Sequence, residues 1–365
     1  MIRVLHVVGK MHYGGMETFI MNVYRHIDRE KVQFDFLVHY EEAGEYDDEI
    51  RRLGGKIYVM PRTVPQNYFI YKKALLKFFT EHREYKIIHG HLHSVAYIYH
   101  DIAKRTGDRV CITHAHNNGY DKNLKGITGY YTALIAQKYT DVFFGCSNEA
   151  CEKFFPKAIK QGKKMIVVKN GIETEKYKFS AEIRDEVRRE LGTEDNYVIG
   201  HIGRFSPQKN HKFLLSIFSE ILKKRPDSKL VLVGKGPLEN EIRNLADELS
   251  LKEHIVFLGA RSDVPRLLQG MDAFLLPSLY EGLGIVLVEA QAAGLKCFTS
   301  SNVSKEAEVT DLLDFLDLNQ SAEYWADKVL SSVSYNREDK TKDIVSSGFD
   351  ISETANMLQD FYLKA

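Results

Sequence analysis

The chain has 365 residues, of which 44% are apolar, 27% charged and 11% aromatic, and this is the composition of an ordinary globular protein. At about 100–200 residues per domain, the length predicts two domains that each bury a core. The 50 basic and 50 acidic side chains cancel, which argues against a uniformly basic nucleic-acid-binding protein. Four cysteines form no Cys-x-x-Cys pair, and no apolar stretch is long enough to span a membrane. We therefore expect a reduced, cytoplasmic protein.

Charge is distributed unevenly along the chain. Residues 1–170 carry 26 basic and 18 acidic side chains, whereas the remainder carries 24 and 32, and 11 of the 14 histidines lie in the first part. Such asymmetry suggests two surfaces with different partners, although solvated surfaces that merely differ between domains explain it equally well. The stretch Phe154–Lys164, with four lysines beside two phenylalanines, is a candidate for contact with an anionic membrane. A solvated charged face is the alternative.

Short β-branched segments alternate with amphipathic helical patterns along the whole chain. The strands expected in the first half are Ile2–Val8, Gln33–Val38, Lys56–Val59, Lys86–Gly90, Arg109–Thr113, Asp141–Gly145 and Met165–Val168. Those expected in the second half are Tyr197–Ile202, Lys229–Val233, Ile255–Leu258, Ala273–Leu276 and Lys296–Thr299. Helices are expected between them, and three more after the last strand, roughly Ser321–Val333, Lys340–Ser347 and Ile351–Leu363. Buried strands joined by helices predict parallel sheets, so two doubly wound αβα domains are expected, with a seam in Lys169–Ser180.

Ligands of open α/β sheets bind beyond the carboxyl ends of the strands, so ligand-binding residues are expected in the loops there. After the first strand, Gly14 and Gly15 precede a helix and would let its amides approach an anionic or hydroxyl-rich ligand. A plain tight turn is the alternative. Neither a dinucleotide-binding nor a P-loop glycine pattern is present.

Loops of the second half carry a stronger signal. Gly203-Arg204-Phe205 leads to Lys209, and an arginine and a lysine on one loop can converge on a diphosphate. A second close-approach turn follows at Gly234-Lys235-Gly236-Pro237. Farther along, Glu281, the turn Gly282-Leu283-Gly284 and Glu289 follow another strand. Eight residues of helix would separate the two carboxylates by about 12 Å, too far for a glycosidase pair but suited to an extended ligand. A capping Glu281 and a solvated Glu289 are the alternative.

Histidines mark two strand ends of the first half. His89, His91 and His93 alternate along one strand end, and His114 and His116 along another, so each set shares a face. Lining of a polar cleft is the favoured interpretation. A metal site of these five histidines, in a metal hydrolase, is an alternative without an accompanying acidic or cysteine cluster.

Taken together in this order, Asn170-Gly171-Ile172, the Gly203–Lys209 loop, the Gly234–Pro237 turn and Glu281-x7-Glu289 resemble the signature of retaining glycosyltransferases of family 4. The resemblance extends over essentially the whole chain and favours the subgroup that builds bacterial capsule and exopolysaccharide. It implies the GT-B fold, with two Rossmann-like αβα domains facing a central cleft. Residues 1–170 would bind the acceptor, 171–348 the nucleotide sugar, and the helix within 349–365 would cross back to the first domain.

The resemblance also implies roles for individual residues. Arg204 and Lys209 would hold the donor diphosphate, Glu281 the sugar and Glu289 the ribose, and His116, chosen over His114, would lie beside the sugar. The residues implied in donor binding are Gly14, Gly15, Gly203, Arg204, Lys209, Ala260, Arg261, Glu281, Gly282, Leu283, Gly284 and Glu289. Many family members have Phe in place of Leu283, a difference on the sugar side that leaves the donor sugar open. Many also have Pro in place of Lys296, a difference expected to affect only the turn.

The implied reaction transfers a sugar, most commonly from a UDP-sugar in this family, to a hydroxyl of a glycan or lipid-linked acceptor with retention of configuration. No metal or other cofactor is expected, because Arg204 and Lys209 would replace a cation. The inner face of the membrane is the expected place of any peripheral contact. A nucleotide-sugar epimerase or hydrolase on the same fold is the alternative enzyme, and a non-catalytic nucleotide-sugar-binding protein is a third possibility.

Overall fold

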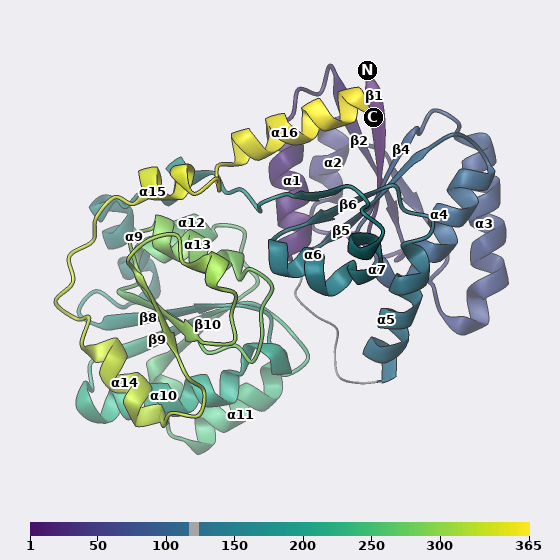
Figure 1. Cartoon of the computed structure of the whole chain (residues 1–365). Coiled ribbons are helices and arrows are strands. Elements are labelled where there is room, and N and C mark those ends of the chain that lie inside the picture. Colours follow the sequence, from purple (N-terminus) through teal and green to yellow (C-terminus); the bar gives the residue numbers. More distant parts are fainter. Residues whose placement is uncertain (117–123) are drawn as a thin grey trace. The chain divides into compact units, whose positions relative to one another are not determined.

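The computed structural model describes residues 1–116 and 124–365 and divides the chain into two compact units (Figure 1). Unit 1 comprises Met1–Gly171 together with Ile351–Ala365, and unit 2 comprises Ile172–Asp350. Each unit has its own parallel sheet covered by helices on both faces, so the expected pair of doubly wound αβα domains is confirmed.

The sheet of unit 1 has seven strands in the order β3-β2-β1-β4-β5-β6-β7. Their bounds are β1 Ile2–Val7, β2 Val32–Val38, β3 Ile57–Val59, β4 Ile87–Gly90, β5 Val110–Ala115, β6 Val142–Gly145 and β7 Met165–Val167. All neighbouring strands pair in parallel. Because β1 lies between β2 and β4, the order reverses at β1/β4, and the loops that follow these two strands leave in opposite directions.

Helices cover both faces of this sheet. They are α1 Gly15–His26, α2 Asp47–Arg52, α3 Tyr68–Glu81, α4 Ala96–Arg105, α5 Leu124–Ala136, α6 Asn148–Phe154, α7 Pro156–Lys160 and α16 Ile351–Lys364. One apolar core joins β1 and β2 to α1, α2 and α16, and another joins the opposite face to α3 and α4. The last helix, α16, therefore completes a unit whose other residues precede Ile172.

The sheet of unit 2 has six strands in the order β10-β9-β8-β11-β12-β13, also parallel throughout. Their bounds are β8 Tyr197–Ile202, β9 Ser228–Val233, β10 Ile255–Gly259, β11 Ala273–Leu276, β12 Lys296–Ser300 and β13 Leu313–Leu316. Here the order reverses at β8/β11. The helices are α8 Thr174–Tyr177, α9 Ala181–Leu191, α10 His211–Lys224, α11 Glu239–Glu248, α12 Val264–Gln269, α13 Ile285–Ala292, α14 Ala322–Leu330 and α15 Thr341–Ser346. Each face of the sheet carries its own core.

The expected strands all form, most within two residues of their predicted bounds, but β13 is an additional strand. It is short, and its Leu-Asp-Phe-Leu sequence shows no clear alternation of apolar and polar residues. In the structure Leu313 and Leu316 are buried and Asp314 is exposed. No helix within the described ranges combines the length and the apolar character that crossing a membrane requires.

The C-terminal helix α16 is held by an apolar face at helical spacing. Ile351, Ala355, Leu358 and Tyr362 are buried in the core with α1 and the sheet, whereas Phe361 is only partly buried. The Tyr362 hydroxyl also lies 2.7 Å from Nδ1 of His89 on β4. Helix α16 thus contributes apolar packing and one buried polar contact to unit 1.

This packing predicts that Leu358→Ala lowers the free energy of unfolding of unit 1 by about 2–5 kcal/mol, as expected when a buried leucine is truncated. The neighbouring Met357 is 38% exposed, so Met357→Ala should change stability by less than about 1 kcal/mol. Denaturant unfolding of both variants measures the difference. Equal effects of the two substitutions would contradict the packing of α16 on unit 1.

Candidate active site

The carboxyl edge of the unit 2 sheet brings together most of the predicted donor residues. Strands β8 and β11 are neighbours at the point where the strand order reverses, and such a switch point is the usual ligand site of an open α/β sheet. The loop after β8 carries Arg204 and Lys209, and the loop after β11 carries Glu281. Two cations and a carboxylate therefore lie on neighbouring loops at one edge of the sheet.

Arg204 and Lys209 differ in what they contact. Arg204 is exposed, and its side chain makes no hydrogen bond or ion pair with any residue that the structure describes. Lys209 is mostly buried, and its Nζ lies 2.6 Å from Oε1 of Glu281. Lys209 thus has a fixed position, whereas the Arg204 guanidinium is available to a ligand.

Glu281 is only 8% exposed, and three side chains contact its carboxylate. Besides the ion pair with Lys209, it accepts hydrogen bonds from the Ser278 hydroxyl at 2.8 Å and from the Gln208 side-chain amide at 3.2 Å. A buried carboxylate requires such partners because desolvation of an unpaired charge is costly. The loops after β8 and β11 are therefore cross-linked through one carboxylate.

Backbone contacts fix the same loops. The Leu279 amide donates to the Gln208 carbonyl, and the Asn210 side chain donates to the Pro277 carbonyl. Gly234 and Gly236, after β9, approach the β8 loop so closely that a Cβ on either would lie within 2.4 Å of a backbone oxygen. The predicted close-approach turn therefore packs against the Gly203–Phe205 backbone.

The turn that precedes α13 places the remaining donor residues. Leu283 is 2% exposed, and Gly284, the N-cap of α13, has a left-handed backbone with φ of 69°. The helix begins only at Ile285, so the expectation of eight helical residues between Glu281 and Glu289 is wrong. The glycine-containing turn replaces the first helical turn of that estimate.

Glu289 lies on α13 and is largely removed from water. Burial raises the pKa of its carboxyl to about 7, which a hydrogen bond with Tyr177 only partly opposes. Burial disfavours the ionised form of this carboxyl at neutral pH, so the raised pKa does not stabilise the fold. Carboxyls of this kind are frequent at functional sites.

Ala260 and Arg261 follow the edge strand β10, which is separated from β8 by β9. Ala260 is exposed. Both carboxylate oxygens of Asp263 accept from the Arg261 guanidinium at 2.7 Å. The charge of Arg261 is therefore already matched, and its backbone is the part that a ligand can use.

Gly14 and Gly15 lie at the start of α1 in unit 1. Gly14 is the N-cap, and a Cβ there would lie 2.5 Å from Oε2 of Glu17. A Cβ on Gly15 would meet nothing within 4 Å. A side chain at Gly14 would thus displace only the end of the Glu17 side chain, and Gly15 borders open space.

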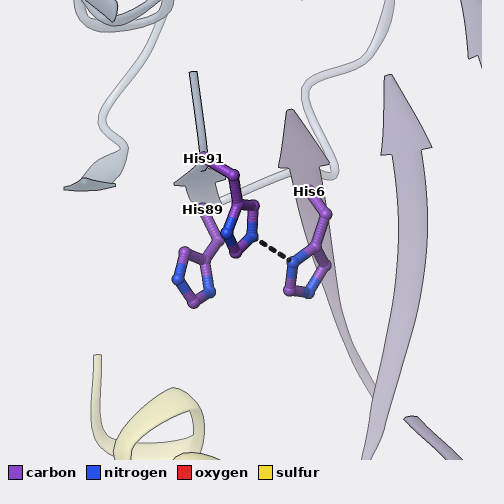
Figure 2. A group of neighbouring side chains, drawn as sticks. All are labelled: His6, His89 and His91. Carbon is purple, nitrogen blue, oxygen red and sulfur yellow. Dashed lines mark hydrogen bonds between the residues drawn. The ribbon is translucent and has the colours of Figure 1, made fainter. Parts of the chain in front are cut away.

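The predicted histidines gather on the unit 1 sheet beneath α1 and α16, and the structure adds one to them. His6 on β1 lies opposite His89 on β4, and His6, His89 and His91 form a group shown in Figure 2. His91 also lies 2.7 Å from His116. We call His6, His89, His91, His114 and His116 the histidine cluster. His93 instead packs against Phe154 and bonds to the His114 carbonyl.

Burial determines the charge of the histidine cluster. It lowers the pKa of His6 and His116 to about 3 and moves those of His89, His91 and His114 well below the usual value. All five rings are therefore neutral at pH 7. His114 is fully buried, while His116 is partly exposed, so only the latter can touch a ligand from solution.

The expected membrane-contact segment is arranged differently from the prediction. Phe154 and Phe155 are 4% and 2% exposed and belong to a core with Phe143, so an exposed aromatic patch at Phe154–Lys164 is wrong. Both rings lie at the C-terminal end of α6 and pack into the protein rather than facing solvent. An apolar stripe is instead exposed on α5, formed by Ile127, Tyr131 and Ile135.

Comparison with known proteins agrees with this architecture. Residues 13–176 match the model of Glycosyltransferase Family 4, and residues 183–341 match that of Glycosyl transferases group 1. The putative glycosyltransferase EpsF of Bacillus subtilis is 30% identical over 370 residues, which cover 99% of this chain and 96% of EpsF. The chain belongs to this glycosyltransferase family.

Two further relatives extend the comparison. The Escherichia coli UDP-Gal:alpha-D-GlcNAc-diphosphoundecaprenol alpha-1,3-galactosyltransferase is 28% identical to this glycosyltransferase over 99% of the chain and 97% of its own length. The crystal structure of Anabaena HepE in complex with UDP and glucose superposes with a TM-score of 0.80 over the whole of both chains at 19% identity. The predicted GT-B fold is thereby confirmed.

Not every residue of this candidate site could be predicted from the sequence. Ser278 and Gln208, which hold Glu281, stood within the motifs but had no predicted partner. His6 was also missed, although its signal was available. It is one of two polar residues, with Arg3, in the first strand, and β1 pairs with β4.

The raised pKa of Glu289 predicts a pH-dependent effect of Glu289→Gln on stability. The folded pKa of about 7 exceeds the ordinary glutamate pKa of 4.5, so the native state binds more protons between these values and loses stability as the pH rises. The variant lacks this loss, and its stability relative to the wild type should increase by about 2–3 kcal/mol between pH 5 and pH 8.

Denaturant unfolding at the two pH values measures this difference. Glu308→Gln is the matched control, because Glu308 is exposed in the same unit and should show no pH-dependent difference. A pH-independent effect of Glu289→Gln would contradict the buried position of this carboxyl.

Proposed function

We propose that this glycosyltransferase moves a sugar from a UDP-sugar to a hydroxyl of a glycan or lipid-linked acceptor, with retention of configuration, in capsule or exopolysaccharide synthesis. The proposal rests on one observation at the β8/β11 switch point. There the Arg204 guanidinium, which has no partner among the described residues, is on the same loop as Lys209 of the Lys209–Glu281 ion pair. The relatives named for UDP-sugar substrates and polysaccharide synthesis support the choice of donor and pathway class.

The donor diphosphate would bind between the guanidinium of Arg204 and the ammonium of Lys209. Arg204 offers a planar pair of N–H donors, and Lys209 a compact charge already oriented by Glu281. When Lys209 turns to the phosphate, Glu281 accepts from sugar hydroxyls in its place, with Ser278 still donating to it. Glu289 accepts from the ribose diol, and the site needs no metal to balance the phosphate charge.

Departure of the nucleoside diphosphate is the step that these cations accelerate. The glycosidic C–O bond breaks and negative charge grows on the β-phosphate, where preorganised donors stabilise it. The acceptor hydroxyl attacks from the same face, and its proton passes to the departing phosphate oxygen. His116 would orient the sugar as a neutral ring, consistent with its lowered pKa.

Unit 1 would bind the acceptor, and its surface suits an acceptor held at an anionic membrane. Residues 1–170 carry an excess of basic side chains. The α5 stripe of Ile127, Tyr131 and Ile135 recurs every four residues along the helix and is exposed by 50% or more at each position. Apolar side chains on a helix face beside basic surface are typical of interfacial contact.

The transfer reaction predicts the behaviour of Arg204→Ala. With a UDP-sugar and a lipid-diphosphate-linked acceptor, its turnover should fall by about 10²–10³-fold, the usual effect of removing one donor to a developing oxyanion. Arg189→Ala is the control, since Arg189 on α9 is exposed and donates to the Asp185 carbonyl of its own helix, and it should keep wild-type turnover. Mass spectrometry of the product measures both.

Three readouts of the same assay test the finer parts of the proposal. The product should keep the anomeric configuration of the donor by NMR, and Mg²⁺ or Mn²⁺ added to metal-free enzyme should not increase the rate. Donor incubated alone should release little sugar; release as fast as transfer would indicate a nucleotide-sugar hydrolase instead. Near-normal turnover of Arg204→Ala would overturn the assignment of the diphosphate site.

The membrane contact predicts that Ile127→Ser/Ile135→Ser weakens cosedimentation with vesicles that contain anionic phospholipid by at least tenfold, because two exposed apolar side chains are removed. Exposed Leu249 and Val333 lie in unit 2, so Leu249→Ser/Val333→Ser is the control and should bind as the wild type does. Equal binding of both double variants, or no binding by the wild type at low salt, would remove the contact.

A further inference from the structure

The histidine cluster is a group of five buried or partly buried imidazoles on three adjacent strands. His6 comes from β1, His89 and His91 from β4 and the residue that follows it, and His114 and His116 from β5 and the residue that follows it. Figure 2 shows His6 and His91 turned toward each other from neighbouring strands. The transfer reaction proposed above uses only His116, so four of these rings have no assigned role.

Hydrogen bonding alone leaves the first row of the histidine cluster unsatisfied. His6 Nδ1 lies 3.1 Å from His91 Nε2, and His91 Nδ1 lies 2.7 Å from His116 Nε2. A neutral imidazole has one N–H and one bare nitrogen, so this row of three rings always ends in one N–H. The two possible end atoms, His6 Nε2 and His116 Nδ1, are both buried and without a partner among the described residues.

The second row has the same difficulty. The Tyr362 hydroxyl lies 2.7 Å from His89 Nδ1, and His89 Nε2 lies 3.1 Å from His114 Nδ1. His114 Nε2 is then buried with no partner within the described part of the chain. A buried donor without an acceptor costs about 1–3 kcal/mol. Hydrogen bonds within the cluster alone therefore leave it destabilising to the fold.

Metal-binding geometry is present in the same rings. His91, His114 and His116 each offer one ring nitrogen, and these three nitrogens lie within 4.8 Å of one another. His6, His89 and His91 form a second such group that is wholly buried. Of the two groups only the first includes a partly exposed ring, His116, and so offers a path for an ion.

We propose that His91, His114 and His116 form a binding site for a divalent transition metal ion of the Zn²⁺ type. Imidazole is a preferred ligand of Zn²⁺, Co²⁺ and Ni²⁺, and three such ligands leave a fourth position open to water. Mg²⁺ and Mn²⁺ favour oxygen ligands, so this site is distinct from any cation at a donor diphosphate. It is also in unit 1, whereas the diphosphate residues are in unit 2.

The rings behind the ligands serve as their supports. If His91 binds the ion through Nδ1 and His114 through Nε2, the opposite nitrogen of each carries a proton. The His91 Nε2–H then donates to His6 Nδ1, and the His6 proton lies on its Nε2. The His114 Nδ1–H donates to His89 Nε2, and the His89 Nδ1–H donates to the Tyr362 hydroxyl. Metal-ligating histidines almost always donate their second N–H to such a partner. The histidine cluster therefore supplies both ligands and the residues that orient them.

Cobalt substitution tests the site without reference to transferase activity. Tag-free protein treated with EDTA and dialysed should bind one Co²⁺ per chain with visible ligand-field absorption, which one equivalent of Zn²⁺ abolishes. His116→Gln should weaken Co²⁺ binding at least 100-fold, because it removes a ligand, and loss of a supporting residue alone costs 10–100-fold. His254→Gln, in unit 2, should bind Co²⁺ as the wild type does.

Two further measurements keep the result interpretable. Thermal unfolding of His116→Gln in EDTA should match that of the wild type, since His116 lies at a strand end. His6→Gln should weaken Co²⁺ binding only 10–100-fold, as a supporting residue would. The proposal is overturned if the wild type binds no Co²⁺ at micromolar concentrations, if His116→Gln binds as well as the wild type, or if His6→Gln alone abolishes binding.

Discussion

Parallel strand pairing is the constraint on which the rest of this molecule depends. Strands buried on both faces commit their backbone groups to neighbours and their side chains to a core, so chemistry is left to the loops at the carboxyl ends. In each unit the strand order reverses once, at β1/β4 and at β8/β11. Both reversals carry the unusual polar residues, histidines in unit 1 and a cation–carboxylate group in unit 2.

Within unit 2 the polar group is organised before any ligand arrives. Glu281 holds Lys209 and is itself held by Ser278 and Gln208, while backbone bonds tie the β8 and β11 loops together. Of the charged residues in these two loops, Arg204 alone has no side-chain partner among the described residues. Preorganised charges favour charge development in a transition state. In the proposed reaction the Lys209–Glu281 ion pair exchanges its partners within loops that these bonds tie together.

Much of this arrangement follows from the sequence, because the patterns involved are local. Continuous apolar strands gave both sheets, and the loops after them gave Arg204, Lys209, Glu281 and Glu289 as residues of one edge. Contacts between loops were less accessible. The ion pair of Lys209 with Glu281 joins residues 72 positions apart, and the resemblance assigned each residue to a ligand rather than to the other. The site assignments themselves remain predictions for the experiments above.

The failures have physical causes of the same kind. Phe154 and Phe155 stood beside lysines, but nothing local shows that both rings are required by the core around Phe143. Gly284 adopts a left-handed backbone, so α13 begins only at Ile285. Counting the residues between the two glutamates does not reveal this later start. His6 looked like an ordinary strand residue until the pairing of β1 with β4 placed it opposite His89.

The discontinuity of unit 1 has a consequence for how the protein is made. Residues 351–364 are translated after all of unit 2, yet they cover the core of α1, β1 and β2 and place Tyr362 beside His89. Domains generally fold as units while the nascent chain emerges. All of unit 2 is therefore synthesised while residues 1–171 still expose the face that α16 covers. Unit 1 acquires its full core only when α16 closes over α1, β1 and β2.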